Sequence, residues 1–505
     1  MIIVQGLLRF CIKVSGHAEV NKTLLNNMLR STAFVFLPGK EYFYLMKKAV
    51  VIGSGLGGLE CAFILAGRGM DVTVLERSAR PGGCLQGFTR GGIRFDTGFH
   101  CVGGLGKGGA LRTVMEYFGL IDLPWRRLDP EGAEEVVIGR DRFVLPSGFE
   151  AYGDALCGFF PSESDAVHRF VGLLEEVSLN ILETSDGDRM ALFRRGALQY
   201  LEETFRDPLL RKVVSGTSLK MELTPQLPLY PFAEINGSYV QGVWQLEGGG
   251  DAITARLLDG IAGRGGVLRT GAEAVRIIES GGCAAGVELS DGEVVPADLV
   301  ISDAPPAVTV SLLGKDSSVR KVYRRRVSSL AGTFGMFTAN IVVDGGFPVP
   351  ERNIYVHCPG ADLWRTDLGS TGSVMVHPYP GGGRLDILSP MYAPEERGEA
   401  YEGIKRKKLS ECLDLAEQAL PGLKEAAKLI YTSTPLTWQE SLGLPGGAAY
   451  GLRKDFSTID TCLLSPRTPL RGLFLTGSGL ALHGVLGTSM TALRTCSAIL
   501  GESVI

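Results

Sequence analysis

The sequence predicts an α/β fold in which one domain is assembled from three separate segments of the chain. Residues 48–76 read as a strand, a glycine-rich turn, a helix and a second strand. A helix followed by strands returns at 248–305, and a strand, a glycine turn and a helix occupy 472–500. Because the residues between these segments follow other patterns, we expect a second domain of mixed α+β structure to interrupt the first.

The first segment has the order of elements that is typical of a dinucleotide-binding unit. The apolar run Ala49–Ile52 has strand character, and the stretch Leu59–Gly67 has helical periodicity. A second strand, Val72–Leu75, ends at Glu76. A glycine-rich turn lies between the first strand and the helix, so the order is strand, turn, helix, strand and acidic residue, which predicts a Rossmann-type dinucleotide site.

The glycine-rich turn has the spacing G-x-G-x-x-G, formed by Gly53, Gly55 and Gly58. The first glycine permits the tight turn, the second lets the backbone approach a diphosphate, and the third lets the helix pack against the strand. The diphosphate then lies at the helix N-terminus, where free N–H groups and the positive dipole end favour an anion. Glu76 is placed to accept hydrogen bonds from a ribose, which favours FAD or NAD over NADP.

Two later glycine turns favour FAD over NAD. Gly82-Gly83 follows the acidic residue, and glycines there let the backbone approach the diphosphate from its other side. Near the C-terminus, the strand Leu473–Leu475 and Thr476-Gly477 precede a helix that we expect from about Thr488. Its N-terminus would offer free N–H groups and a positive dipole end to the flavin end of FAD.

The other expected elements lie between these segments. They are a strand pair over 91–101, helices over 111–119, 166–182, 190–205, 252–263 and 395–420, and strands over 274–278, 285–289 and 294–301. We therefore expect an FAD-binding domain made of 46–109, 246–305 and 470–505, and a substrate-binding domain made of 110–245 and 306–469.

The composition narrows the class of protein. The 505 residues are 45% hydrophobic and 21% charged with a net charge of −4, and they contain no long basic run, so nucleic acid is not an expected partner. Apolar runs stay short of the ~18 residues that a membrane-spanning helix needs. The ten cysteines form no C-x-x-C pair, so neither a metal site nor a dithiol motif is expected. With no recognisable secretion signal, these cysteines are expected to be reduced thiols in the cytoplasm.

Residues 1–45 do not share the pattern that begins at Met46-Lys47-Lys48. The apolar stretch Met1–Phe10 is short, is interrupted by Arg9 and has no small-residue cleavage site, so it is a poor signal peptide. We expect Met46 to be the native initiator and residues 1–45 to be a non-native extension or a disordered segment.

Six motifs carry a resemblance to a known family. They are GSGLGGLECA (53–62), ERSARPGGC (76–84), FDTGFHCVGG (95–104), the segment GGG…GGVLRTGAEAVRI (248–277), the stretch STPLTW…GGAAYGL (433–452), and GLFLTGSG…GVLGTSMTAL (472–493). With these motifs the chain resembles the FAD-dependent phytoene desaturase superfamily, and within it the retinol saturase and prolycopene isomerase branch. FDTGFH and the 433–452 stretch look nearest to bacterial retinol-saturase-like proteins.

The resemblance implies a glutathione-reductase-like fold that binds FAD without a covalent link. It implies cofactor contacts from several parts of the chain: Gly53, Gly55, Gly57, Gly58, Gly82 and Gly83 at the diphosphate, Glu76 at the adenosine ribose with Arg77 beside it, the backbone of Val275 at the adenine, and Gly477, Gly487 and Thr488 at the ribityl chain and flavin ring.

The chain departs from the family's wider pattern at two positions. Position 84 is Cys where amine oxidases and protoporphyrinogen oxidases carry Arg, which argues against an amine or porphyrinogen substrate. Position 478 is Ser where many relatives have an acidic residue, so a carboxylate contact with the ribityl group is not expected there. A non-catalytic lipid-escort protein is a third alternative, because the Rab GDP-dissociation inhibitors share this fold without a working flavin. The complete C-terminal flavin segment argues against it.

The resemblance implies an oxidoreductase that saturates, desaturates or isomerises C–C double bonds of a lipophilic polyene or isoprenoid. His100, in FDTGFH, and His483 are the candidate proton donors, and Tyr450 is a candidate lining residue of the substrate cavity. Cys84 and Cys101 are expected to be inert thiols. The sequence shows one nucleotide-binding pattern, so no separate NAD(P)H-binding domain is expected. NAD(P) remains a possible electron donor or acceptor. The substrate implies peripheral contact with the inner face of the membrane, and the oligomeric state is left open.

Overall fold

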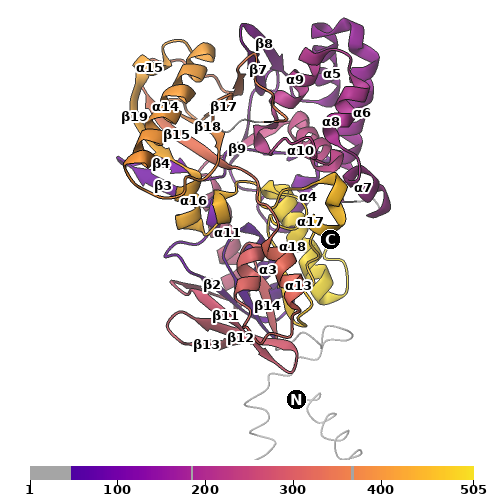
Figure 1. Ribbon diagram of the computed structural model, residues 1–505, viewed down its shortest axis with the longest axis vertical. Helices are drawn as coiled ribbons and strands as arrows, with labels where there is room; N and C mark the ends of the chain where they lie inside the picture. The colour runs from indigo at the N-terminus through magenta and orange to yellow at the C-terminus, as the bar shows by residue number, and fades with distance from the viewer. Residues whose placement is uncertain (1–46, 183–185, 366–368) are drawn as a thin grey trace, which may run out of the picture. The chain divides into compact units, whose positions relative to one another are not determined.

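A five-stranded parallel sheet gathers the three segments that the sequence assigns to one domain (Figure 1). Its strands, in spatial order, are β10 (Val267–Thr270), β2 (Asp71–Glu76), β1 (Lys48–Ile52), β14 (Leu299–Ser302) and β20 (Leu473–Leu475). This computed structural model describes residues 47–182, 186–365 and 369–505. The extension expected at 1–45 lies outside the described residues.

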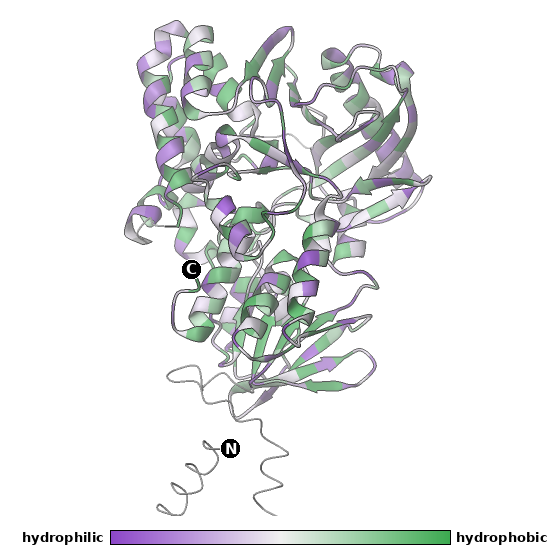
Figure 2. Ribbon diagram, turned by 180° about the vertical axis from the view of Figure 1, so that it is seen from behind, coloured by the Kyte–Doolittle hydropathy of each residue, from purple (hydrophilic) through white to green (hydrophobic). Residues whose placement is uncertain are grey.

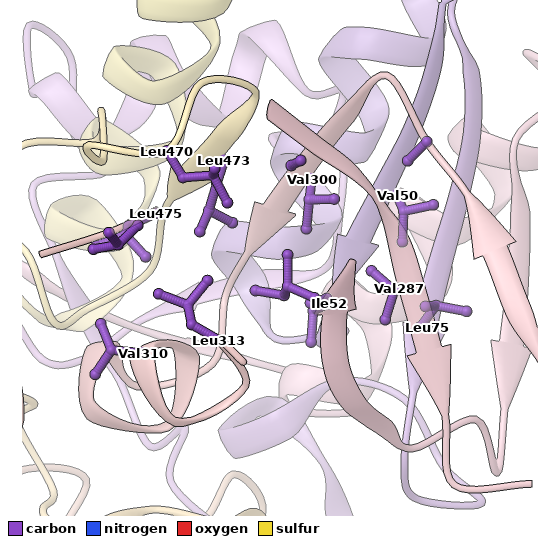
Figure 3. Packing of buried hydrophobic residues seen from close by; sticks show 14 of the residues in the cluster. Val50, Ile52, Leu75, Val287, Val300, Val310, Leu313, Leu470, Leu473 and Leu475 are labelled. Atoms are coloured by element: carbon purple, nitrogen blue, oxygen red, sulfur yellow. The ribbon is translucent and has the colours of Figure 1, made fainter. Parts of the chain in front are cut away.

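Both faces of β2, β1, β14 and β20 are covered, which is why these strands are apolar over most of their length (Figure 2), whereas the edge strand β10 is more exposed. Helices α3 (Leu56–Gly67), α11 (Gly250–Ala262) and α18 (Gly484–Leu500) pack together, with α3 against β1 and β2. Side chains alternate between the two faces of a strand, and Val50 and Ile52 point into a core shared with Val287 of the neighbouring antiparallel sheet (Figure 3).

That antiparallel sheet consists of β11 (Ala274–Ser280), β12 (Cys283–Leu289) and β13 (Val294–Pro296). The single strand expected over 294–301 is wrong: β13 and β14 belong to different sheets. Pro296 ends the first strand because it lacks an N–H for the ladder. Asp298 then turns the chain, and its carboxylate accepts the N–H of Lys48 at 2.8 Å at the start of β1.

A seven-stranded sheet forms from the two intervening segments. Its strands, in spatial order, are β19 (Ala427–Ser433), β15 (Gly335–Val343), β18 (Arg384–Met391), β17 (Ser373–Pro378), β16 (Asn353–His357), β7 (Glu134–Ile138) and β8 (Asp141–Leu145). Only the pair β16–β7 is parallel among the described strands of this sheet. Helix α14 (Glu399–Ala419) packs on β16, β17 and β18. This arrangement confirms the mixed α+β structure expected between the Rossmann-type segments, whereas the domain boundaries stay a prediction.

Helix α10 (Leu229–Gln241) packs against α5 (Phe149–Phe159), α6 (Ser164–Leu179), α7 (Asp186–Phe193) and α8 (Ala197–Thr204). Elsewhere, α4 (Ala110–Tyr117) packs on α18, α12 (Pro306–Ser311) on α13 (Lys321–Ser328), α15 (Leu423–Ala426) on α14, and α16 (Pro435–Leu442) on β15 and β19. The remaining helices are α9 (Pro208–Gly216) and α17 (Ile459–Cys462). The one helix expected over 190–205 is wrong because α7 ends before Gly196, which pairs with Pro228 and lies against the ring of Phe456.

Two small sheets connect these parts. In the first, β3 (Gly87–Arg90) pairs with β4 (Ile93–Asp96), so the strand pair begins before Gly91 rather than at it. Gly91 and Gly92, with φ of 56° and 76°, form the hairpin turn. In the second, β5 (Val102–Gly103) and β6 (Trp125–Arg127) flank β9 (Val243–Leu246).

The C-terminal helix differs from its expected start in a way that matters for the site. It begins at Gly484, with His483 as its N-cap, so Thr488 lies in its second turn instead of its first. The free N–H groups of this helix therefore belong to residues near Gly484 and Val485. Among the described residues, none of the helices has both the length and the hydropathy required to cross a bilayer.

Candidate functional site

The glycine-rich turn between β1 and α3 is held in shape by contacts that leave no room for side chains. The N–H of Gly53, which has φ of 94°, donates to the carbonyl of Leu75 at 2.8 Å. A Cβ at Gly58 would lie 2.3 Å from the carbonyl oxygen of Gly53, so α3 packs directly on the turn. Gly83 brings its backbone to the turn from the other side, since a Cβ there would lie 3.3 Å from the Cα of Gly55.

Glu76, at the end of β2, ties the turn to the next loop. Its Oε2 accepts the N–H and the hydroxyl of Ser54 at 3.1 and 2.5 Å, and its Oε1 accepts the N–H of Ser78 at 2.8 Å. The N–H of Gly82 donates in turn to the carbonyl of Ser54 at 3.0 Å. The second glycine pair is thus bonded to the first turn, as an approach to one diphosphate from both sides requires.

Asp303, just after β14, lies inside the glycine turn and was not identified from the sequence. Its carboxylate accepts the backbone N–H groups of Gly55 and Gly58. A Cβ at Gly55 or Gly477 would lie only 2.4 or 2.5 Å from one of its oxygens. Burial, reinforced by the negative charge of Glu76, raises the pKa of Asp303 to about 7. Asp303 follows β14, which lies next to β1 in the sheet. The two strands are far apart in the sequence, so no local pattern indicates that Asp303 reaches the glycine turn.

A cavity of about 1590 Å³, including the space open to solvent, runs along this turn. Eight of the residues predicted to bind the cofactor line it: Gly53, Gly55, Gly57, Glu76, Arg77, Gly82, Gly83 and Thr488. Ser478 and Cys84, the two positions that depart from the family pattern, also line it. The cavity thus joins the glycine turn to the first two turns of α18.

Four predicted residues do not line this cavity. Gly58 lies beneath the turn, and Gly477 lies behind it, against Gly57 and Asp303. The side chain of Val275 is 43% exposed on β11, and the cavity wall ends at Ala274. Gly487 lies against Leu482 and lines a separate small cavity, because α18 starts four residues earlier than expected and turns Gly487 away.

A second cavity of about 870 Å³, again including the space open to solvent, adjoins the first. The two share five lining residues: Gly98, Phe99, Tyr450, Gly484 and Val485. Much of the remaining wall is apolar, including Val102, Leu219, Ile235, Met375, Leu388 and Leu486. The three residues that the sequence singled out for the substrate side, His100, His483 and Tyr450, all line this second cavity.

The two histidines are neutral at physiological pH. Burial lowers the pKa of His100 to about 4, and its Nδ1 lies 3.6 Å from Asp386, which is beyond hydrogen-bond distance. Asp386 is itself buried, and burial raises its pKa to about 8. His483 has its pKa lowered to about 4 by burial, and its Nε2 lies 3.1 Å from the carbonyl oxygen of Lys220.

Tyr450 is fixed between the two cavities. Its hydroxyl donates to the carbonyl of Leu219, its ring centroid lies 4.8 Å from that of His483, and its N–H donates to Thr333 at 3.0 Å. Burial raises the pKa of its phenol, so the hydroxyl stays protonated.

Lys220 and Glu234 are polar residues of the second cavity that the sequence did not reveal. The Nζ of Lys220 donates to Glu134 at 2.9 Å and lies 3.8 Å from the ring centroid of Tyr239. Glu234, on α10, is 2% exposed, and burial raises its pKa to about 8. The sequence shows Glu234 as a single acidic residue within the apolar stretch Phe232–Ile235. A single acidic residue in a helix does not by itself indicate a buried carboxyl group at a cavity.

The thiols near the cavities are not activated. Burial, with the charge of Asp303, raises the pKa of Cys84 to about 12, and burial raises that of Cys101 to about 11. Both are free cysteines. No cluster of His, Cys, Asp and Glu suited to a metal ion occurs among the residues that the structure describes.

The residues that line the first cavity fit an FAD molecule in their chemistry. The side-chain-free turn, the N-terminus of α3 and the acceptor Glu76 are arranged for a diphosphate and a ribose. Asp303 fits beside a diphosphate in its protonated form, which its raised pKa supports.

Comparisons with known proteins agree with this geometry. Residues 56–500 match the family described as flavin containing amine oxidoreductase. The chain is 27% identical to the all-trans-retinol 13,14-reductase of Danio rerio, over 90% of this chain and 85% of that protein. It is 27% identical to prolycopene isomerase 1 of an Oncidium hybrid cultivar, over 80% and 75% respectively.

Among solved structures, an oxidoreductase from Methanosarcina mazei has the same fold, with a TM-score of 0.64 and 19% identity over 90% of this chain and 100% of that one. The α/β fold and the FAD cofactor expected from the sequence are thereby confirmed. On this evidence, the chain belongs to the flavin-containing amine oxidoreductase family and is an FAD-dependent oxidoreductase.

Proposed function

We propose that this oxidoreductase acts on C–C double bonds of a lipophilic polyene, with the polyene in the second cavity. The observation that carries the proposal is the charge state of that cavity. Of its titratable lining residues, His100, His483 and Glu234 are neutral near pH 7, and the cation of Lys220 is paired with Glu134. An apolar chain fits such a wall, and FAD supplies hydride or electron transfer at its ring.

The relatives support this substrate class. The printed names of two of them, a retinol 13,14-reductase and a prolycopene isomerase, refer to polyenes. Saturation, desaturation and isomerisation all remain within the proposal, and NAD(P) is one candidate electron donor or acceptor. Because a polyene partitions into lipid, we also propose that the protein takes it up at a membrane surface.

For the cofactor, we propose that the turn Gly53–Gly58 and Gly82-Gly83 hold the diphosphate and that Glu76 binds the adenosine ribose. The N–H groups at the start of α18 would face the flavin end and stabilise negative charge on the reduced ring. Thr488 lines the same part of the cavity from the second turn of that helix.

Amine oxidation is the competing function, since the family is described by it. A substrate ammonium group is stabilised by a free carboxylate. The second cavity offers instead a neutral Glu234 and a lysine cation, and among the described lining residues no carboxylate is left ionised and unpaired. This charge pattern favours a polyene over an amine. Cys84 favours it too, because amine oxidases carry Arg at that position.

The test is turnover by the purified, yellow holoenzyme. All-trans-retinol, a prolycopene preparation and putrescine are each incubated under air, and again anaerobically with chemically reduced flavin. Products are then identified by chromatography and mass spectrometry. We expect a change in the saturation or geometry of a polyene and no consumption of putrescine. Oxidation of putrescine with both polyenes unchanged would refute the proposal, and a colourless protein that cannot be loaded with FAD would refute the cofactor assignment.

A further inference from the structure

Glu234 is a buried carboxyl group at the wall of the second cavity. It lies on α10 between Ala233 and Ile235, and its side chain is 2% exposed. Its carboxyl forms no hydrogen bond or ion pair with any residue in the described part of the chain, and it lines the second cavity. Burial alone raises its pKa to about 8, so it carries a proton at neutral pH.

An unpartnered buried carboxyl group has a cost that the fold does not offset. Removing such a group from water without a hydrogen bond costs about 1–3 kcal/mol in proteins. Buried carboxyl groups elsewhere in this chain do have partners: Asp386 accepts from Asn340 at 2.7 Å and from Tyr379 at 2.8 Å. Glu234 differs because the space beside it is a cavity, which a bound molecule can fill.

We propose that Glu234 hydrogen-bonds to a hydroxyl group of the polyene, so that the site prefers a hydroxylated polyene to a hydrocarbon polyene. This inference rests on the proposed function and specifies its substrate class. A protonated carboxyl group both donates and accepts a hydrogen bond, as a hydroxyl group does. A bound hydrocarbon would leave the carboxyl group unpaired.

The charges of the cavity favour a hydroxyl over an ionised end group. A carboxylate substrate would need a free cation, but Lys220 is already paired with Glu134, which also accepts the hydroxyl of Tyr355 at 2.8 Å. An ammonium group would first have to displace the proton of Glu234, and it would share the cavity with the cation of Lys220. The relatives do not decide this point, because retinol is an alcohol and prolycopene is a hydrocarbon.

The test compares two ligands on three proteins. The ligands are all-trans-retinol and its deoxy analogue, in which hydrogen replaces the hydroxyl group, and binding to the FAD-loaded enzyme is followed by the fluorescence of the polyene. The proteins are the wild type, Glu234→Gln and Glu234→Met. Glutamine keeps a donor and an acceptor, whereas methionine fills similar volume with neither.

We expect the wild type to bind retinol at least about tenfold more tightly than the deoxy analogue. Glu234→Gln should keep most of this preference. Glu234→Met should lose it by binding retinol more weakly and the deoxy analogue equally or more tightly, which also shows that the variant is folded.

Three results would overturn the inference. They are equal affinities of the wild type for both ligands, a preference for retinol that survives in Glu234→Met, and tighter binding of all-trans-retinoate than of retinol. A wild-type enzyme that transforms polyenes without distinguishing the two ligands refutes this inference alone. Failure to bind or transform any polyene refutes the proposed function as well.

Discussion

Replacing Asp303 by asparagine tests how the glycine turn accommodates an acidic residue beside a diphosphate. The carboxyl group is buried, accepts the N–H groups of Gly55 and Gly58, and faces the charge of Glu76. Its pKa rises from an ordinary value of 3.8 to about 7. Asparagine keeps an acceptor oxygen of the same size at the same place but carries no charge.

The sign of the effect follows from proton linkage. A carboxyl group whose pKa is raised in the folded state makes its full contribution to the free energy of unfolding at low pH. This contribution is lost as the pH rises through the folded pKa. Between pH 5 and pH 7 the unfolded chain is ionised at position 303, whereas the folded protein still holds most of the proton. At about 1.4 kcal/mol per pH unit, the wild type loses about 2 kcal/mol over this range through Asp303 alone.

The assay is urea-induced unfolding of the wild type and of Asp303→Asn at pH 5 and pH 7. We expect the gain in unfolding free energy from the substitution to be about 2 kcal/mol larger at pH 7 than at pH 5. Asp298→Asn is the control, because Asp298 also follows a strand and accepts a backbone N–H but is exposed. The reasoning fails if the effect of Asp303→Asn is the same at both pH values.

The same pair of proteins reports on the cofactor. The diphosphate of FAD is an anion, and an ionised Asp303 in the turn would repel it. We expect FAD affinity of the wild type to fall as the pH rises from 6 to 8, and that of Asp303→Asn to change less, as measured by quenching of flavin fluorescence. A wild-type affinity that rises over this range would contradict the assignment of the diphosphate to this turn.

Three further predictions concern packing and protonation. Gly58→Ala should abolish flavin absorbance in the purified protein, because its Cβ would lie 2.3 Å from a backbone oxygen, whereas Gly172→Ala, with no heavy atom within 4 Å, should keep it. The ring protons of His100 and His483 should show no titration by NMR above about pH 5.5, since burial lowers both pKa values to about 4. A transition near pH 6.5 would show that the rings are solvated. Cys84 should resist iodoacetamide at pH 8 in the folded protein, since its pKa is raised to about 12, and rapid alkylation there would contradict this shift.

The sequence predicts the cofactor side of the site well because that chemistry depends on local backbone geometry. Gly53, Gly55 and Glu76 lie within one strand–helix–strand unit, and their spacing alone places them along one cavity. The C-terminal half was predicted less well. The helix there starts at Gly484, so Gly487 faces away from the cofactor cavity while Thr488 faces it. A shift of a few residues in a helix start changes which side chains face a ligand.

The substrate side could be predicted only in part. His100, His483 and Tyr450 were chosen from their places in glycine-rich loops, and all three line one cavity, while their chemical roles stay predictions. Glu234 and Asp303 were missed. What sets them apart is desolvation, which depends on residues far away in sequence, and no local pattern reports it.

The fold of this enzyme accounts for its cofactor, whereas the lining of the second cavity determines which substrates can bind. The Rossmann-type sheet, the glycine turn and helix α18 form an FAD site that a family named for amine oxidation shares with relatives named for polyenes. Function depends on the site rather than the fold. In this chain the walls beyond Tyr450 come from α10, from the residues around Lys220 and from strands β17 and β18, and they bring together a paired lysine, two neutral histidines and a neutral glutamate. A charged substrate would lose its hydration there without gaining an opposite charge. A polyene with one hydroxyl group would lose little hydration free energy and would give the carboxyl group of Glu234 a hydrogen-bond partner.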